Sequence, residues 1–290
     1  MNGRLSEVES VAVVGAGFMG TGIAEAVAVA GLPVIVRDVD EASLGRARER
    51  IDASLARAVR GRKLSESSAG EARERIELTT TLEAVGAADL VVEAVPEIEQ
   101  LKLDVMGAID DVVSDQAIVA SNTSSIPIAQ LAQAISDPSR VLGLHFFSPV
   151  PVMPLVEVVV ALDTSSGTVE RARRFIERLS KRPIETKDRS GFIVNMLLVP
   201  YLMAAVRMYE EGFASREDID NGMKLGCGHP MGPLTLCDFI GLDVLYAVCD
   251  SLYEEFKRDE YAPPPLMKRM VASGRLGRKS GRGFYEYGAG

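Results

Sequence analysis

A glycine-rich turn near the start of the chain constrains its fold more than any other feature. The apolar run Val11–Val14 leads straight into the turn GAGFMG, Gly15–Gly20, where a helical pattern begins. In a dinucleotide-binding fold the first glycine allows the tight turn, the second lets the backbone approach a pyrophosphate, and the third lets the helix pack on the strand. The pyrophosphate lies at the positive end of the helix dipole. The motif predicts such a site, and the alternative is a glycine turn that binds nothing.

An acid follows the next apolar run. Val34–Arg37 is predicted as a strand, and Asp38 comes directly after it. A carboxylate at this position can accept hydrogen bonds from both hydroxyls of an adenosine ribose, and it repels a 2′-phosphate. Arg37 leaves some room for a phosphorylated cofactor, but the acid favours NAD.

The first two-thirds of the chain alternates apolar runs with helical patterns. This alternation is typical of a parallel sheet covered by helices. The expected strands are Val11–Val14, Val34–Arg37, Ile76–Thr79, Leu90–Val92, Ala117–Ala120, Val141–His145 and Leu155–Val160. The expected helices are Phe18–Ala30, Ala42–Arg60, Ile98–Val113, Ile128–Ile135 and Thr168–Ser180.

From about Lys187 onward the strand-like runs stop. The expected helices there are Phe192–Glu211, Arg216–Leu225, Asp238–Lys257 and Leu266–Ser273. The first is apolar nearly all round, so we expect it to be buried against another domain or another subunit. A chain of 290 residues is long enough for two domains. We therefore expect an α/β domain over residues 1–187 and an all-helical domain over residues 188–290.

Composition excludes several classes of protein. Hydrophobic residues make up 47% of the chain and charged residues 25%, as in soluble globular proteins. The net charge of −9 argues against binding to nucleic acid or to an anionic membrane. The uncharged stretch Ser190–Val206 is too short and too broken to span a membrane. Cys227, Cys237 and Cys249 lack metal-ligand spacing, so we expect no metal, and we expect reduced thiols in a cytoplasmic protein.

The chain has two histidines, His145 and His229, which narrows the search for a general base. His145 ends an apolar run, and ligands of open α/β sheets bind at the carboxyl ends of strands. Glu157 interrupts the apolar run PLVEVVV, where a carboxylate needs a partner. Paired with His145, it would fix the tautomer and raise the basicity of the ring. The alternatives are a core histidine and an edge-strand glutamate that faces water.

Three further polar sites have both a functional and a structural interpretation. In the stretch Ser121–Ser125, after a predicted strand, one serine is expected to cap the next helix and another could face a substrate or nicotinamide. Asn195, in an apolar helix, bonds either a backbone carbonyl or a group in a cleft between domains. His229, in the Gly/Pro-rich turn GHPMGP, is better explained by a turn or capping role.

Six stretches in order along the whole chain resemble the short-chain L-3-hydroxyacyl-CoA dehydrogenases, and among them the 3-hydroxybutyryl-CoA dehydrogenases. They are GAGFMG, SNTSSI, HFFSPVPVMPLVE, GFIVN, HPMGPLTLCDFIGLD and GRKSGRGFYEY. The resemblance implies an N-terminal Rossmann-type domain followed by a helical domain that makes a homodimer. It also implies NAD as cofactor and an acyl-CoA as substrate.

Carried onto this chain, the resemblance implies His145 as catalytic base, Glu157 as its orienting partner, and Ser124 and Asn195 as hydrogen-bonding partners of the substrate's C3 oxygen. The implied cofactor contacts are Gly15, Gly17, Phe18, Met19, Gly20, Asp38, Glu97, Lys102, Ser124, Ser148 and Lys279. The basic residues Arg60, Arg62 and Lys63 match an arm that contacts coenzyme A.

Two positions depart from the pattern of the family. Ser148 stands where many members have Asn, and Pro154 stands where many have Lys. Ser148 keeps a hydroxyl for the nicotinamide amide, whereas Pro154 alters the charge near the cleft.

The expected activity is the reversible oxidation of a (3S)-3-hydroxyacyl-CoA, such as 3-hydroxybutanoyl-CoA, in fatty acid or butanoate metabolism. Two alternatives stay open. The first is a dehydrogenase of the same fold that acts on a free hydroxy acid or a sugar acid. The second is a non-catalytic NADH-binding or structural relative.

Overall fold

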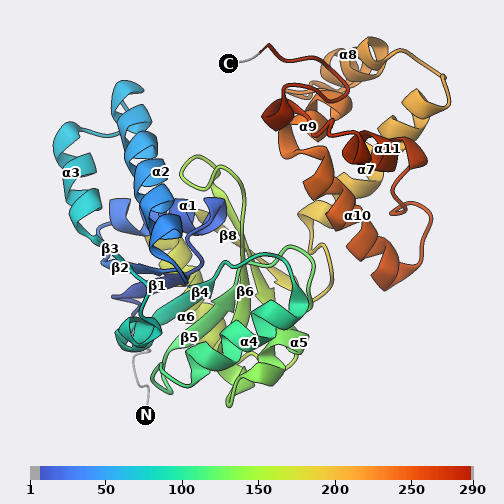
Figure 1. Cartoon of the computed structure of the whole chain (residues 1–290). Helices are drawn as coiled ribbons and strands as arrows, with labels where there is room; N and C mark the ends of the chain where they lie inside the picture. Colours follow the sequence, from blue (N-terminus) through green and yellow to red (C-terminus); the bar gives the residue numbers. More distant parts are fainter. Residues whose placement is uncertain (1–6, 289–290) are drawn as a thin grey trace. The chain divides into compact units, whose positions relative to one another are not determined.

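The computed structural model describes residues 7–288, which form two compact units (Figure 1). The first unit extends to Asp188 and the second begins at Arg189. The strands are β1 (Val11–Val14), β2 (Val34–Arg37), β3 (Ile76–Thr79), β4 (Leu90–Glu93), β5 (Ile118–Ser121), β6 (Val141–Phe146), β7 (Leu155–Val160) and β8 (Arg182–Lys187). The α-helices of this unit are α1 (Phe18–Val29), α2 (Glu41–Arg60), α3 (Glu66–Glu74), α4 (Glu99–Asp110), α5 (Ile128–Leu131) and α6 (Ser166–Arg178). Short 3₁₀ helices cover Leu82–Ala87, Ala132–Ala134 and Pro138–Arg140.

The strands of the first unit form one sheet, in the order β3-β2-β1-β4-β5-β6-β7-β8. The strands from β3 to β6 are parallel, and the order of the chain reverses between β1 and β4. At such a switch point the loops after the two strands diverge, which opens a crevice at the carboxyl edge of the sheet. The N-terminal part of the expected fold, an α/β unit with a Rossmann-type sheet, is confirmed.

Helices cover both faces of this sheet. Helices α1, α2, α3 and α6 share one apolar core with alternate strand residues such as Val11 and Val13. Helices α4 and α5 pack against β4, β5 and β6, and Figure 1 shows them beside these strands. Strands covered on both faces must be apolar throughout, which explains runs such as VAVV and IVAS.

The sheet is parallel as expected except at one pair of strands. Strand β7 pairs antiparallel with β6, and β8 pairs parallel with β7. Strand β8 was not predicted because its sequence, RPIETK, carries charges on an edge where side chains reach water. Helix α3 was missed as well; it is short and begins at the Ser65 cap, which accepts a hydrogen bond from the Ser68 N–H.

The second unit is helical, which confirms the C-terminal part of the expected fold class. Its helices are α7 (Val194–Glu210), α8 (Arg216–Cys227), α9 (Pro233–Ile240), α10 (Leu242–Phe256) and α11 (Pro265–Ala272), with a 3₁₀ turn at Arg278–Ser280. The single helix expected over Asp238–Lys257 is wrong, because Gly241 adopts φ +101° and separates α9 from α10. Among the described residues, no helix combines the length and the apolar character that crossing a membrane requires.

Candidate functional site

The glycine turn after β1 has the geometry that a bound pyrophosphate requires. Gly15 has φ +110°, and a Cβ there would lie 2.6 Å from the Ala94 carbonyl oxygen of the loop after β4. A Cβ at Gly20 would collide with the Gly15 carbonyl oxygen, whereas a Cβ at Gly17 would meet nothing within 4 Å. Gly17 is also the N-cap residue of α1 and has no side chain to fill that position. The first and third glycines are therefore required by packing, and the second leaves space before free helix N–H groups.

Asp38 lies beside this turn. One of its carboxylate oxygens accepts a hydrogen bond of 2.7 Å from the Ala16 N–H, and the other accepts one of 2.7 Å from the Val39 N–H. Each oxygen keeps a further lone pair, which can accept a ribose hydroxyl. Phe18 is exposed at the start of α1, and Met19 is half-buried. The residues present therefore fit an NAD molecule.

The antiparallel pairing of β6 and β7 places His145 directly opposite Glu157. The distance from His145 Nδ1 to Glu157 Oε2 is 2.7 Å, and both side chains are buried. Glu157 lies on an inner strand and is fully buried, so the interpretation as an edge residue facing water is excluded. A carboxylate accepts and does not donate, so Nδ1 carries the hydrogen and Nε2 carries the lone pair.

Ser124 completes a chain of three side chains. Its hydroxyl lies 3.1 Å from His145 Nε2, where it can donate to the lone pair of the ring. Ser124 is half-buried and sits in the loop after β5, at the same edge of the sheet as the end of β6. The arrangement presents a basic nitrogen and a hydroxyl together, with a carboxylate behind them. Such a group can take a proton from a substrate hydroxyl and stabilise the imidazolium that results.

The expectation that a serine of the loop Ser121–Ser125 caps the next helix is wrong. The N–H groups of Ile128 and Ala129, at the start of α5, instead donate to the Asp188 carboxylate. This acid lies 60 residues away along the chain, so a local pattern could not identify it. The hydroxyls of the loop are thereby left for other contacts.

Glu97 and Lys102 lie next to this loop. One Glu97 oxygen accepts hydrogen bonds from the Thr123 hydroxyl at 2.5 Å and the Ser124 N–H at 2.9 Å. The Lys102 ammonium lies 3.3 Å from the other Glu97 oxygen and 2.8 Å from Glu93 Oε1. Burial raises the pKa of Glu97, but the Lys102 charge and the Thr123 and Ser124 hydrogen bonds outweigh it, so the pKa lies below its ordinary value. Glu97 is therefore a carboxylate at neutral pH.

The other residues discussed from the sequence lie either on one loop of the first unit or in the second unit. Ser148 and Pro154 are exposed on the loop between β6 and β7. Asn195 is half-buried in the first turn of α7 in the second unit, and Lys279 of that unit forms an ion pair of 2.6 Å with Asp243. His229 follows α8; its N–H donates to the Met223 carbonyl and its ring contacts the Tyr201 hydroxyl.

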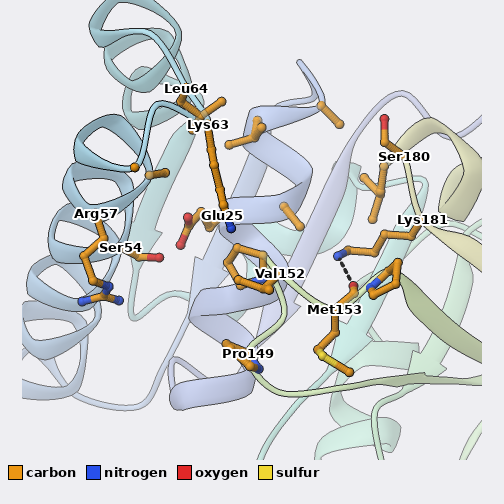
Figure 2. Close-up of a pocket in the computed structure, with 18 residues that line it drawn as sticks. Glu25, Ser54, Arg57, Lys63, Leu64, Pro149, Val152, Met153, Ser180 and Lys181 are labelled. Carbon is orange, nitrogen blue, oxygen red and sulfur yellow. Dashed lines mark hydrogen bonds between the residues drawn. The ribbon is translucent and has the colours of Figure 1, made fainter. Parts of the chain in front are cut away.

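A cavity of about 680 Å³ lies within the first unit, between α1, the end of α2 and the loop before β7 (Figure 2). Lys63 lines it, whereas Arg60 and Arg62 are exposed outside it. Arg57, on the last turn of α2, lines it as well. The predicted basic arm therefore reaches the cavity through Lys63, together with Arg57 on the helix that precedes it.

Two charged residues of this cavity were missed by sequence reasoning. Glu25 is 3% exposed; burial raises the pKa of its carboxyl, although the Ser54 hydroxyl and Arg57 lower it. Burial lowers the pKa of Lys181, whose ammonium donates to the carbonyls of Val150 and Met153. Glu25 left a sequence signal, because it interrupts the apolar helix stretch IAEAVAV.

Comparisons with known proteins agree with this geometry. The model of the family "3-hydroxyacyl-CoA dehydrogenase, NAD binding domain" matches residues 10–189, and that of the "3-hydroxyacyl-CoA dehydrogenase, C-terminal domain" matches residues 191–287. A 3-hydroxybutyryl-CoA dehydrogenase of Mycobacterium tuberculosis is 50% identical, over 97% of this chain and 99% of its own. The human mitochondrial hydroxyacyl-coenzyme A dehydrogenase is 42% identical, over 97% of this chain and 91% of its own.

A solved structure extends the likeness to the fold. The crystal structure of an (S)-3-hydroxybutyryl-CoA dehydrogenase from Ralstonia eutropha matches with a TM-score of 0.92 at 45% identity, and the match covers 98% of this chain and all of the other. The glycine turn, the acid after β2 and the buried histidine–glutamate pair thus occur in a chain whose relatives match it over nearly its whole length. The chain belongs to the 3-hydroxyacyl-CoA dehydrogenase family.

Proposed function

We propose that this protein catalyses the NAD-dependent, reversible oxidation of a (3S)-3-hydroxyacyl-CoA to a 3-oxoacyl-CoA, with 3-hydroxybutanoyl-CoA as a substrate. The observation that carries the proposal is the hydrogen-bonded chain from Ser124 through His145 to Glu157. It lies at the carboxyl edge of the sheet whose first strand ends in the glycine turn. Family membership supplies the substrate class.

In this mechanism His145 Nε2 takes the proton of the C3 hydroxyl as the C3–H bond breaks. NAD, held by the glycine turn and Asp38, would supply the acceptor for the hydride from C3. The Nδ1–H of His145 donates to Glu157 throughout, so the imidazolium forms beside a buried carboxylate. The hydroxyl of Ser124 turns from His145 toward the substrate oxygen and stabilises its developing charge. Asn195 has the same task in this proposal, and in the reverse direction His145 returns the proton.

One assay separates this function from its alternatives. Purified protein should oxidise NADH with acetoacetyl-CoA, turn over free acetoacetate at least about 100-fold less efficiently, and prefer NADH to NADPH because Asp38 repels a 2′-phosphate. A preference for acetoacetate would favour the free hydroxy acid dehydrogenase. NADH binding without any turnover would favour the non-catalytic relative.

The cavity beside α2 is the place that we propose for the coenzyme A portion. Its cationic border includes Arg57 and Lys63, and Figure 2 shows both on the same side as Glu25. Phosphates held there would lie away from the reacting carbon, so their contacts contribute uniform binding. Neutralising Arg60, Arg62 and Lys63 together should raise the KM for acyl-CoA and flatten its salt dependence, while NADH binding stays unchanged.

A matched pair of variants sharpens this test. Lys63→Gln removes the one charge of the predicted arm that lines the cavity, and the double variant Arg60→Gln/Arg62→Gln removes two exposed charges outside it. The first should raise the KM by about tenfold, as expected for one charged contact, and the second by no more than about threefold. Collapse of kcat with an unchanged KM would place the arm in the chemistry and contradict the proposal.

We further propose a homodimer formed through the second unit. Several large apolar side chains of this unit are exposed, among them Leu197 at 72%, Phe213 at 78% and Leu225 at 83%. Apolar surface of this kind favours a partner surface. Sedimentation at low micromolar concentration should give about twice the 31.2 kDa chain mass, and a fully active monomer would refute the dimer. A cytoplasmic location completes the proposal, supported by three free cysteines that include the exposed Cys227.

A further inference from the structure

A single carboxylate oxygen holds the loop that carries Ser124. Glu97 Oε1 accepts the Thr123 hydroxyl at 2.5 Å, the Ser124 N–H at 2.9 Å and the Ser125 N–H at 3.2 Å. Three consecutive residues thus point donors at one anion, an arrangement in which loops usually hold a phosphate or another bound anion. Here the chain supplies the anion itself, and the loop conformation depends on where Glu97 lies.

Glu97 is held in turn by a buried cation. Its other oxygen lies 3.3 Å from the Lys102 ammonium, whose side chain is only 1% exposed. The same ammonium donates to both Glu93 oxygens, at 2.8 and 3.0 Å, and to the Val95 carbonyl at 3.2 Å. All of the donors of Lys102 are therefore engaged inside the protein.

Glu93 anchors the network to the sheet. It is the last residue of β4, is fully buried, and accepts the Ser121 hydroxyl at 2.5 Å and the Val95 N–H at 2.7 Å. A buried ion pair gains little net stability, because desolvation of the two charges offsets their attraction. The pair does, however, fix the relative positions of the ends of β4 and β5 and the start of α4. The loop with Ser124 begins at the end of β5.

We propose that Thr123, Lys102 and Glu93 are positioning residues of the reaction, which act through Glu97 to keep the Ser124 hydroxyl beside the His145 imidazole. The inference rests on the proposed function, because it requires Ser124 and His145 to act on the substrate. The distance at stake is the 3.1 Å between Ser124 Oγ and His145 Nε2. A displacement of about 1 Å at a reacting group can cost about 100-fold in rate.

The first test compares two substitutions of the same buried residue. Thr123→Val keeps the volume and removes the hydroxyl that donates to Glu97, whereas Thr123→Ser keeps this hydroxyl. We expect Thr123→Val to lower kcat for acetoacetyl-CoA reduction by about 10- to 100-fold, and Thr123→Ser to stay within about threefold of wild type. The Kd for NADH, measured by fluorescence titration, should change by less than about threefold in both.

A matched control measures the cost of losing a buried threonine hydroxyl elsewhere. Thr168→Val removes a hydroxyl on α6 that donates to the Ser139 carbonyl, in the same unit but outside this network. It should lower the melting temperature and leave kcat unchanged. If Thr168→Val lowers kcat as much as Thr123→Val does for the same loss of melting temperature, the proposal is overturned.

The ion pair is tested by removing both charges at once, since removal of one would leave the other buried and unpaired. The double variant Glu93→Gln/Lys102→Met should lower kcat by about as much as Thr123→Val and keep NADH affinity. A loss of NADH affinity of about tenfold or more with a wild-type kcat would make Lys102 a cofactor contact and overturn the proposal.

A second set of variants separates this inference from the function on which it rests. Ser124→Ala should lose kcat, and the further change Thr123→Val should then cost almost nothing, because the hydroxyl to be positioned is gone. If Ser124→Ala loses activity but Thr123→Val does not, the positioning role fails and the proposed function stands. If both Ser124→Ala and His145→Gln keep full activity, the proposed mechanism fails and the positioning role fails with it.

Discussion

The two histidines of this chain lie in different units and have opposite surroundings. His145 ends a central strand, is 5% exposed, and has a carboxylate at Nδ1 and a hydroxyl at Nε2. His229 lies in the turn after α8, where its N–H caps the helix and its ring meets the Tyr201 hydroxyl at 3.2 Å. The same imidazole thus has the partners that a general base requires in one unit, and it lies in a turn in the other. The difference comes from the neighbours, since the side chain is the same.

The largest effect is expected when each histidine is replaced by glutamine in a separate variant and the two variants are compared. His145→Gln should lower turnover by about 10²–10⁴, the usual contribution of a positioned general base, and should still bind NADH. His229→Gln should change turnover by less than about threefold, because a turn residue contributes mainly to stability. Steady-state rates and NADH titration of both variants test the comparison. Full activity in His145→Gln would refute it.

The carboxylate behind His145 is expected to have the next largest effect. Glu157→Gln keeps the shape but removes the charge that favours the imidazolium. The rate should therefore fall by about tenfold or more, but by less than the loss of about 10²–10⁴ expected for His145→Gln. The acid limb of the pH–rate profile for oxidation should move to lower pH, because a carboxylate beside an imidazole stabilises its protonated form.

The pair should also act as one unit, so the losses in His145→Gln/Glu157→Gln should combine far less than additively. Rates of the wild type, both single variants and the double variant between about pH 5 and pH 9 measure this coupling. Additive losses would show that Glu157 works independently of His145.

The next prediction concerns Asp38, which we expect to bind the adenosine ribose of the cofactor. Asp38→Ala should weaken NADH binding by about 1.5–3 kcal/mol, the usual worth of a charged hydrogen-bonding group, and should reduce the preference over NADPH. It should leave the pH profile of turnover at saturating NADH unchanged, in contrast to Glu157→Gln. An unchanged Kd for NADH would remove Asp38 from the cofactor site.

The smallest effect concerns Glu25, a buried carboxylate with a different setting from Glu157. Burial raises the pKa of its carboxyl in the folded protein, so folding favours the protonated form. Stability is therefore lost as the pH rises from the ordinary pKa of a glutamate through the raised pKa of the folded state. Glu25→Gln should therefore raise the melting temperature at pH 8 by roughly 2 °C, the shift that about 1 kcal/mol gives in a domain of this size. Near pH 4 the gain should vanish. A gain that is larger in acid than at pH 8 would show that Glu25 is stabilised as a carboxylate.

Local patterns identified the glycine turn, most strands and both members of the buried His145–Glu157 pair. The glycines could be found because a tight turn and a close strand–helix contact each exclude a side chain, which leaves a signal at the residue itself. His145 and Glu157 could be found because polar groups in apolar runs are expensive unless they are paired. Strand β8 and helix α3 could not be found, since an exposed, charged strand and a short helix have weak periodicity.

The same reasoning failed wherever a contact joins distant parts of the chain. The cap of α5 comes from Asp188, and the loop with Ser124 is held by Glu97, which lies 26 residues before Thr123. Neither acid differs in sequence from an ordinary surface acid. Their partners depend on the order of strands in the sheet, which brings the ends of β4, β5 and β6 to one edge.

The amino-acid sequence by itself determined the type of each domain, the nucleotide-binding turn and the polar residues that need partners, because these follow from local sterics and from the cost of burial. Only the tertiary structure decided which partners they have. The antiparallel turn of β7 sets Glu157 opposite His145, and the fold seals Lys102 between two carboxylates. The physical reason is that hydrogen bonds and ion pairs act over about 3 Å, whereas the residues that form them are brought within this distance only by the packing of the whole sheet.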